Sequence, residues 1–495
     1  MKNIRFFSIL LALLMVLTCF AACSDTGTDP ADTTVPTVVT TENTTPQTES
    51  IYDANGYLKD EMGDFDFGGR DFTIFYLDDT TYPEFFTEGI TGDNINDANY
   101  NRNAIVEQRT GVKLQYITHP GAYPNIDAFV EKVTNELQAG TQIDMILCHS
   151  MDSGPIAIRG LCMDLSNNTS FEWDKPWWPE YMMSQLKING KQYFIAGDIS
   201  VNTILEMYVT FFNKEMIDSR NLEDPYELVE KNQWNLDKMW ELCKDTYQDT
   251  NNNGTVDFGD TFGTIFEWEA IDAYINAGGL TFLSNSNGEV TISAEMFGEQ
   301  GINLFDKISS FAGDASAAYL YTESGADGSE GRREFSNGNL LFWVEPIGNT
   351  QKILDSAVDY GIVPVPKATA AQANFYTPVD FPYMTIIPYN VEDVETVSTV
   401  IEIIASESYR NTTHAVFEIT MKYRYANDEN ASSMFDLLRS GMIFDLAMDF
   451  SLTFSHPYNT LRRTIIEGNK WSVVGKTLEK TMSFTLKKQI LPAFD

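Results

Sequence analysis

The sequence predicts an α/β protein of two lobes, each built on a mainly parallel sheet flanked by helices, with a hinge between them. Three observations lead to this fold class. Strands and helices alternate in a βαβαβ order over residues 72–148, and such an order gives a parallel sheet with helices on both faces. A second α/β set follows over residues 236–363. The folded part of the 495-residue chain is about 430 residues long, which is too long for one compact core.

The first α/β set has five elements, in the order strand, helix, strand, helix and strand: 72–76, 96–109, 112–117, 126–137 and 143–148. The second helix gives the strongest pattern, because its apolar residues from Ile126 to Leu137 recur at i, i+3, i+4, i+7 and i+11. Gly111 and Gly140 follow the two helices, and glycine commonly ends a helix.

The second α/β set is expected as helix, strand, helix, strand and strand: 236–247, 288–292, 301–311, 340–344 and 360–363. Later in the chain, Val394, Val397, Ile401 and Ile404 have the spacing of one helix face, so helices are expected to dominate the C-terminal part.

The first 23 residues have the pattern of an export signal. Lys2 and Arg5 precede an apolar run over residues 6–20, which is shorter than the roughly 20 residues that a membrane-spanning helix needs. The small residues before Cys23 suit signal peptidase, and the ending resembles a bacterial lipobox, in which the cysteine is lipidated, with Phe20 where leucine is usual. The expected location is therefore extracytoplasmic, lipid-anchored through Cys23 (a palmitate-type anchor) to the outer face of a bacterial cell membrane. Plain secretion, with Cys23 as a bystander, is the alternative.

Residues 24–50 are rich in Thr, Pro, Ser and Asp and have almost no large apolar side chains. Such a segment cannot bury enough surface to fold. It is expected to be a disordered tether that holds the globular body away from the membrane.

Charge and motif content exclude several function classes. The chain carries 71 acidic and 33 basic residues, a formal net charge of −38, so nucleic acid and anionic lipid headgroups would be repelled. The four histidines show no metal-ligand spacing, and no nucleophile elbow, Walker loop or dinucleotide-binding motif is present. Cys148, Cys162 and Cys243 are too few for a disulfide framework in so large a body. Buried free thiols are the favoured interpretation, with a Cys148–Cys162 disulfide as the alternative. No enzyme activity is expected.

Residues 249–260 have the spacing of a calcium-binding loop. The expected ligands are Asp249, Asn251, Asn253, Thr255 through its backbone carbonyl, Asp257 and Asp260. Gly254 stands at the position of the sharp turn, and Asp260 replaces the usual glutamate, which lowers the expected affinity. A structural Ca²⁺ that clamps this loop is therefore expected, with an Asn/Gly turn that binds no metal as the alternative.

Several short motifs resemble landmarks of the family 1 extracellular solute-binding proteins, the maltose-binding class that delivers ligands to ABC importers. In chain order they are TGVK at 110–113, AG at 139–140 before IDMI, GL at 160–161 before DL, INGKQY at 188–193, FFNK at 211–214, FSNGN at 335–339 and GIVPVP at 361–366. The segments KYRYA at 422–426 and MFDLL at 434–438 resemble a clade of long solute-binding lipoproteins of gut type. Each motif alone is weak, but their order covers nearly the whole body.

This resemblance implies a periplasmic-binding-protein-like fold of type II, in which two rigid lobes close about a hinge around a ligand. It implies a monomer whose partners are a small neutral ligand, most simply an oligosaccharide, and the permease subunits of an ABC transporter. The expected division of the chain is leader 1–22, anchor and tether 23–64, first part of lobe I 65–208, lobe II 209–378, return to lobe I 379–430 and C-terminal helical segment 431–495.

The candidate ligand-binding residues lie after expected strand ends and at the two expected crossings between lobes. They are Asp78, Asp79, His149, Ser150, Glu206, Trp268, Glu269, Trp343, Glu345, Asp380 and Tyr383. Carboxylates accept hydrogen bonds from sugar hydroxyls, and aromatic rings cover the apolar face of a pyranose. Glu206 stands seven residues before Asn213, which is similar to the place of an acidic sugar-binding residue at the family's hinge. Core packing of the aromatics, and a turn role for Asp78 and Asp79, are the alternatives.

Two other functions fit an acidic, exported chain. A glycoside hydrolase needs only two suitably separated carboxylates, and an acidic chain offers many. A surface glycan-binding lipoprotein that serves no transporter is the third class.

Overall fold

The computed structural model describes residues 50–286, 288–322, 329–422 and 430–495. The expected leader, Cys23 and residues 24–49 of the expected tether lie outside the described residues. Residues Ile51–Asp495 form one compact unit. Within the described part of the chain, no helix has the length and apolar character needed to cross a membrane.

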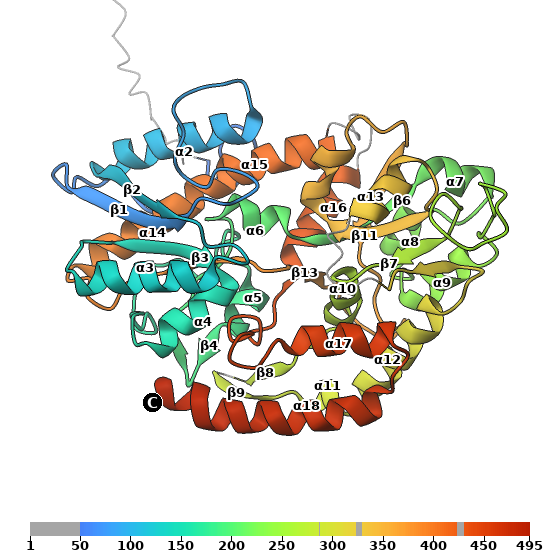
Figure 1. The fold of residues 1–495 in the computed structure, drawn as a ribbon. Coiled ribbons are helices and arrows are strands. Elements are labelled where there is room, and N and C mark those ends of the chain that lie inside the picture. Colours follow the sequence, from blue (N-terminus) through green and yellow to red (C-terminus); the bar gives the residue numbers. More distant parts are fainter. Residues whose placement is uncertain (1–49, 287, 323–328, 423–429) are drawn as a thin grey trace, which may run out of the picture. The chain divides into compact units, whose positions relative to one another are not determined.

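The first lobe is built on a four-stranded sheet in the order β14-β3-β1-β2 (Figure 1). Its strands are β1 (Asp71–Leu77), β2 (Lys113–His119), β3 (Met145–His149) and β14 (Tyr383–Ile386). β1 pairs in parallel with both β2 and β3, while β14 returns from much later in the chain and is antiparallel to β3. The expected βαβαβ order is confirmed, and its strand and helix bounds lie within two residues of those expected.

Helices cover the first sheet on both faces, with α2 above it and α3 below it in Figure 1. The helices of this lobe are α2 (Asn94–Thr110), α3 (Ile126–Gln138), α4 (Ser150–Ile158), α5 (Glu180–Gln185), α6 (Val201–Leu205), α14 (Val394–Arg410) and α15 (Thr412–Phe417). The residues of α3 at the expected helical spacing are all buried. Gly111 ends α2 in the left-handed conformation at φ 68°, which glycine adopts without steric cost.

The second lobe is built on the three-stranded sheet β11-β6-β12 and the parallel pair β10-β7. The strands are β6 (Tyr208–Asn213), β7 (Thr264–Phe266), β10 (Ala318–Leu320), β11 (Phe342–Pro346) and β12 (Tyr360–Pro364). β11 and β12 are both antiparallel to β6. The expectation of a mainly parallel sheet in each lobe is therefore wrong for this one, because β6 enters from the other lobe and runs against its neighbours.

The remaining elements of the second lobe are mostly helical. They are α7 (Lys214–Ser219), α8 (Pro225–Glu230), α9 (Leu236–Cys243), α10 (Ala270–Ala277), α11 (Ala294–Phe297), α12 (Glu299–Ala312), α13 (Ser329–Ser336) and the 3₁₀ helix η1 (Ile347–Ile353). The expected strand at 288–292 is present as β9 (Glu289–Ile292). It pairs with β8 (Leu283–Ser286) in a separate hairpin and not within the main sheet.

The chain crosses between the lobes in two segments that run side by side. Met207 and Val379 form an antiparallel bridge, and the backbone N–H of Asp380 donates to the carbonyl oxygen of Glu206 at 3.3 Å. The short strand β13 (Thr377–Pro378) precedes the second crossing and pairs with β15 (Met442–Ile443). The two crossings are thus held against each other at residues 206–207 and 379–380.

The C-terminal segment packs on the second lobe and ends on the first. It comprises the π helix η2 (Glu418–Lys422), α16 (Asn430–Ser440), α17 (Pro457–Ile466), α18 (Trp471–Thr485), the π helix η3 (Leu486–Ile490) and the 3₁₀ helix η4 (Leu491–Ala493). The Trp471 ring of α18 stacks on Phe305 of α12 at 4.1 Å between centroids. At the chain end, the carbonyl oxygen of Phe494 accepts a hydrogen bond from Lys191 at 2.9 Å.

A second contact between the lobes joins the hairpin β8–β9 to the turn between β4 (Lys187–Ile188) and β5 (Lys191–Gln192). The N–H of Gly190 donates to the carbonyl oxygen of Gly288 at 3.2 Å. A Cβ on Gly288 would collide with the Gly190 backbone, so only glycine allows this approach.

The compact body begins before Phe65, at Ile51. The Asp60 carboxylate is buried and pairs with Arg109 of α2 and Arg410 of α14. The assignment of residues 51–64 to the tether is therefore wrong. The sequence of this polar stretch does not reveal that the Asp60 carboxylate is buried between two arginines. The three cysteines of the body are free thiols, two of them buried.

Candidate functional site

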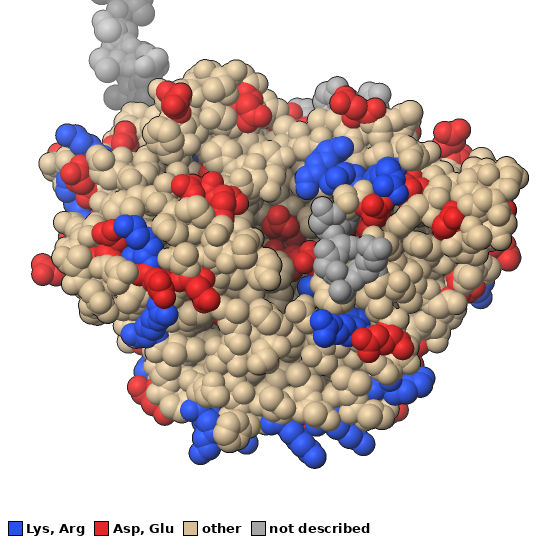
Figure 2. Space-filling model, viewed as in Figure 1, with Lys and Arg blue, Asp and Glu red and all other residues tan. Residues whose placement is uncertain are grey.

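A cleft of about 190 Å³ lies where the two lobes and both crossings meet. Its walls come from the loop after β1, from α6, from the start of β6, from the residue before α10, from the end of β11 and from η1. Figure 2 shows a hollow in the middle of this face with acidic side chains at its floor.

Four carboxylates line this cleft, and all four were expected at a ligand site: Glu206, Glu269, Glu345 and Asp380. Glu206 ends α6 at the first crossing, and Asp380 follows the second crossing. Glu345 lies in β11 opposite Val209 of β6, and Glu269 immediately precedes α10. The two lobes and the two crossings therefore bring these side chains together from positions up to 174 residues apart, the separation of Glu206 and Asp380 (380 − 206).

Burial and repulsion from neighbouring carboxylates favour the protonated forms of Glu206, Glu345 and Asp380. Burial raises the pKa of Glu206 to about 7, with Lys352 opposing and Glu269 adding to the shift. Burial likewise raises the pKa values of Glu345 and Asp380 well above the ordinary range, and the neighbouring carboxylates raise them further. The Lys352 ammonium is the cation on the cleft wall, and this side chain is exposed.

Tyr208 stands at the centre of the acidic group. The residue is only 3% exposed, and it lines the cleft. Burial and all four carboxylates raise its pKa. Its position on the cleft wall makes it a candidate contact for a ligand.

His149, Ser150 and Tyr383 lie beside the cleft but do not line it. His149 caps the N-terminus of α4 by accepting from the Met151 N–H, and its ring stacks on Phe381 at 5.0 Å. Tyr383 packs edge-on against the His149 ring, with 6.0 Å between the ring centroids. Burial lowers the pKa of His149 to about 4, so the imidazole is neutral. Ser150 is fully buried.

Asp78 and Asp79 do not line the cleft either. Asp79 accepts hydrogen bonds from the N–H groups of Gly121 at 2.8 Å and Ala122 at 3.0 Å and from the Asn125 amide. These bonds hold the pKa of Asp79 low against the effect of burial. Asp78 is exposed. The turn role is therefore the correct one, since Asp79 closes the loop before α3.

The two tryptophans occupy the core and not the cleft wall. Trp343 is 1% exposed, and its ring packs on Phe335 at 5.5 Å and on Phe211 at 5.1 Å. Trp268 lies under the Arg462 guanidinium at 5.5 Å. The expectation that Trp343 covers a ligand is corrected. It lies on the same face of β11 as Glu345, but it packs against aromatic rings of the core, while Glu345 stands two residues nearer the crossing.

Arg462 balances acidic neighbours. Its guanidinium pairs with Asp272 of α10 and lies 3.7 Å from the Glu269 carboxylate. Burial raises the pKa of Asp272 to about 7 even though Arg462 opposes the shift.

Sequence reasoning missed much of the polar lining of the cleft, namely Tyr82, Asn202, Tyr208, Asn349 and Lys352. Tyr208 follows Glu206 by two residues, so the expected crossing could have pointed to it. Asn349 and Lys352 lie in a 3₁₀ helix, which gives no periodic signal.

A larger hollow of about 960 Å³ lies between the segment 165–179, α5 and α16. It contains none of the expected ligand residues and does not touch the crossings. The smaller cleft is the candidate site, because a ligand there would contact both lobes.

The expected calcium loop folds with its oxygen-bearing side chains turned toward one another. The amides of Asn251 and Asn253 each donate to the Asp257 carboxylate at 2.8 Å, and the N–H of Gly254 donates to Asp249 at 3.0 Å. Asp260 is fully buried, and its Oδ1 has no hydrogen-bond partner among the described residues. In the described part of the chain, no group of three or more His, Cys, Asp and Glu side chains is arranged to hold a metal ion. A cation would therefore need the two asparagine amides as well.

No family model matches the chain, and no characterised protein matches it by sequence. Solved structures match its fold. A cyclo/maltodextrin-binding protein in complex with maltotetraose superposes with a TM-score of 0.58 at 12% identity, over 87% of this chain and 99% of that one. The ABC substrate-binding protein Lmo0181 from Listeria monocytogenes, in complex with cycloalternan, gives a TM-score of 0.55 at 14% identity, over 85% and 99%. UgpB from Mycobacterium tuberculosis, in complex with glycerophosphocholine, gives a TM-score of 0.52 at 16% identity, over 86% of this chain and 99% of that one.

These likenesses show the fold of the chain. It is the two-lobed, mixed α/β fold of periplasmic-binding-protein-like proteins, as the sequence predicts, and nearly the whole length of each of these structures is matched.

Proposed function

We propose that the protein is an extracytoplasmic solute-binding protein that captures a small hydroxyl-rich ligand, most simply an oligosaccharide, and delivers it to an ABC importer. The observation that carries this proposal is the polar cleft at the two crossings. Its hydrogen-bonding groups come from both lobes. The sugar complexes of the maltotetraose- and cycloalternan-bound relatives agree with a carbohydrate ligand.

The mechanism is closure of the lobes about the crossings. The carboxylates accept hydrogen bonds from hydroxyl groups, the Asn349 amide can donate to them, and a ligand contacts all of these groups only when the lobes are close. A ligand that makes more contacts with the closed form than with the open form shifts the population toward the closed form. The closed form is then the one that the importer recognises.

The lipid anchor at Cys23 belongs to the same proposal. An anchored protein with a tether keeps its ligand near the membrane, where an importer resides. Metabolic labelling with a radioactive or clickable palmitate tests it, because Cys23→Ser should abolish the label and Cys19→Ser should not.

A binding screen tests the central claim. The purified protein should gain thermal stability with one or more members of an oligosaccharide panel, because a ligand at 100 times its Kd adds about 2.7 kcal/mol to the unfolding free energy. Calorimetry should give a Kd in the micromolar range or below. The variant Glu345→Gln should weaken this binding, while Asp218→Asn on the exposed face of α7 should not. A panel without any stabilising member would contradict the proposal.

A glycoside hydrolase is the second candidate, and one observation favours it. A carboxyl whose pKa is raised to about 7, such as Glu206 among other carboxylates, has the property of a general acid. Release of reducing sugar from the same panel distinguishes the two candidates, since a binding protein leaves each glycan intact.

We also propose that residues 249–260 bind a structural Ca²⁺. The buried, unpartnered Oδ1 of Asp260 supports this. Calcium should raise the melting temperature of the purified protein and a chelator should lower it. The effect should vanish in Asp257→Asn and persist in the control Asp306→Asn on α12. Equal melting temperatures with calcium and with chelator would favour the metal-free turn.

A further inference from the structure

We propose that the ligand of the cleft carries a protonated amine on a sugar-like framework, as an oligosaccharide of glucosamine with free amino groups does. This inference rests on the proposed function, because it specifies the chemistry of the ligand for the same cleft. It departs from the sequence-based expectation of a neutral ligand.

The first step is the charge of the lining. Glu206, Glu269, Glu345 and Asp380 all border a cleft whose wall carries one ammonium, that of the exposed Lys352. The nearby guanidinium of Arg462 is already paired with Asp272 and Glu269. A neutral sugar would satisfy hydrogen bonds here but leave the repulsion between carboxylates in place, while an ammonium group offsets it.

The second step is Tyr208. This side chain is buried on the cleft wall with all four carboxylates close enough to raise its pKa. A hydroxyl can accept from an ammonium or donate to a sugar oxygen, so it suits a ligand that carries both groups. A ligand with a cation but no hydroxyls would not need the Asn349 amide in the same wall.

The third step separates an organic cation from a metal ion. Among the residues that the structure describes, no three or more acidic or histidine side chains converge in the way a metal ion requires, and this includes the cleft. Carboxylates spread around a cavity suit a bulkier cation, whose charge is distributed over three N–H donors.

Proton linkage gives the inference a signature. In the free protein, burial and repulsion favour protonated carboxyls, and Glu206 has a pKa of about 7. A bound ammonium favours the ionised carboxylates, so binding must release protons and weaken as the pH falls. The charged groups that face the four carboxylates from the packed elements are Lys352 of η1, Arg462 of α17, Asp272 of α10 and Glu267 between β7 and α10.

The test compares three tetrasaccharides by calorimetry: glucosamine with free amines, N-acetylglucosamine and maltose-type glucose. N-acetylation removes the charge and keeps the sugar ring, so the first two form a matched pair. At pH 6.5 and about 150 mM salt, which screens distant charges, the free amine should bind at least tenfold tighter than its acetylated form. Its affinity should fall by about tenfold at pH 5.0, because a proton must be displaced.

Three variants separate the cleft from non-specific attraction to an acidic protein. Glu345→Gln and Tyr208→Phe should each weaken binding of the glucosamine tetrasaccharide at least tenfold, and Asp218→Asn, which removes an exposed carboxylate on α7, should leave it unchanged. The melting temperature of ligand-free Glu345→Gln should equal or exceed that of the parent, since the substitution removes a carboxylate that is costly to bury. Weak binding by that variant therefore does not reflect misfolding.

Each outcome of these experiments decides for or against the inference, the proposed function or both. Tighter binding of the acetylated or glucose tetrasaccharide than of the free amine overturns this inference and leaves the proposed function standing. Unchanged binding in Glu345→Gln means attraction to the surface and also overturns it. If the wide oligosaccharide panel and the glucosamine tetrasaccharide both fail to bind, the proposed function falls together with the inference.

Discussion

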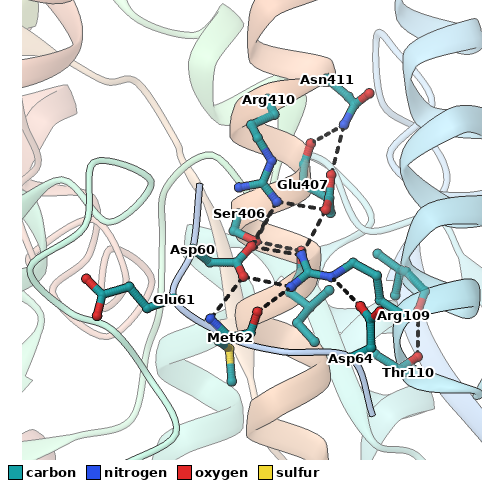
Figure 3. Close-up of polar contacts among 12 residues, drawn as sticks. Asp60, Glu61, Met62, Asp64, Arg109, Thr110, Ser406, Glu407, Arg410 and Asn411 are labelled. Atoms are coloured by element: carbon teal, nitrogen blue, oxygen red, sulfur yellow. Dashed lines mark hydrogen bonds and ion pairs between the residues drawn. The ribbon is translucent and has the colours of Figure 1, made fainter. Parts of the chain in front are cut away.

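Asp60 joins three segments that are far apart in the sequence. Its carboxylate accepts from the Arg109 guanidinium at 2.7 Å, from Arg410 at 2.8 Å and from the Ser406 hydroxyl at 2.7 Å (Figure 3). Glu407 contacts the same two arginines, at 2.9 Å and 2.7 Å. The arginine hydrogen bonds outweigh the effect of burial and hold the pKa of Asp60 well below its usual range.

Replacing Asp60 by asparagine should therefore destabilise the protein strongly. Breaking a buried ion pair leaves uncompensated charge, and the expected loss is about 3 kcal/mol of unfolding free energy. Denaturant unfolding measures it. The adjacent Glu61 is a matched control, because its side chain is 77% exposed in a pair with Lys175 at 2.6 Å. Glu61→Gln should cost less than about 1 kcal/mol, and similar losses for both variants would contradict the assigned role of Asp60.

Glu206 makes a prediction about pH. Its folded-state pKa of about 7 lies above the ordinary value, so the folded protein binds a proton more tightly than the unfolded chain does. The stability linked to this proton is complete at low pH and is lost as the pH rises through 7. Neutral His149, whose pKa is lowered to about 4, opposes this trend only below about pH 6.5.

The melting temperature should thus rise when the pH is lowered from 8.0 to 6.5, and it should rise less in Glu206→Gln. The difference between the two proteins isolates the Glu206 proton from the general decrease in surface repulsion. Scanning calorimetry at several pH values measures it. An identical pH profile for parent and variant would show that Glu206 has an ordinary pKa.

Sequence reasoning identified the four cleft carboxylates because they stand at strand ends and crossings, where topology gathers side chains. It failed for Trp343 and Asp79, because neither the depth at which a strand side chain packs nor the backbone donors available to a carboxylate can be read from a pattern. It also missed Tyr208, whose importance comes from carboxylates distant in sequence.

At the scale of elements, the predictable helices are those with one strongly apolar face. The α3 helix was predictable from five apolar residues at helical spacing, and all five are buried. The antiparallel pairing of β6 with β11 and β12 was not, because pairing direction depends on where the chain enters a sheet and not on the apolar pattern of a strand.

The α4 helix illustrates how closely elements approach. It contains Gly154, where a Cβ would collide with the backbone carbonyl oxygen of Asp449. The adjacent Ser153 hydroxyl hydrogen-bonds to the Asp449 carboxylate, so α4 and the segment around 449 are locked together.

Gly154→Ala should accordingly destabilise the protein by about 3 kcal/mol, the upper part of the range for overpacking, because a backbone atom cannot move aside. Denaturant unfolding again provides the measurement. Gly63→Ala is the control, since a Cβ there meets nothing within 4 Å and Gly63 does not have a positive φ. A loss below about 1 kcal/mol for Gly154→Ala would mean that α4 shifts easily against its neighbour.

At the scale of the whole described body, the chain end ties the lobes together. Phe494 is buried against Tyr193 at 5.1 Å and Phe450 at 6.0 Å, and its carbonyl oxygen accepts from Lys191. These partners belong to the first lobe and to the C-terminal segment, while α18 packs on α12 of the second lobe.

Phe494→Ala should lower the unfolding free energy by about 3 kcal/mol and increase the radius of gyration of the ligand-free protein in small-angle scattering, because the lobes lose one attachment. Phe484→Ala on α18 is the matched control, since that ring is 63% exposed. It should change neither quantity. A destabilised Phe494→Ala with an unchanged radius of gyration would show that the chain end stabilises one lobe without restraining the other.

The contact between Gly190 and Gly288 has a geometric consequence. The Phe494 contact with Lys191 lies directly beside it, so these contacts and the paired crossings at Met207 and Val379 form two separate points of attachment between the lobes. Two rigid bodies pinned at two points keep a single degree of freedom, rotation about the line that joins the pins. The motion available to this protein is then a swing about that axis, as of a door on two hinges, and twisting or sliding of one lobe across the other is suppressed.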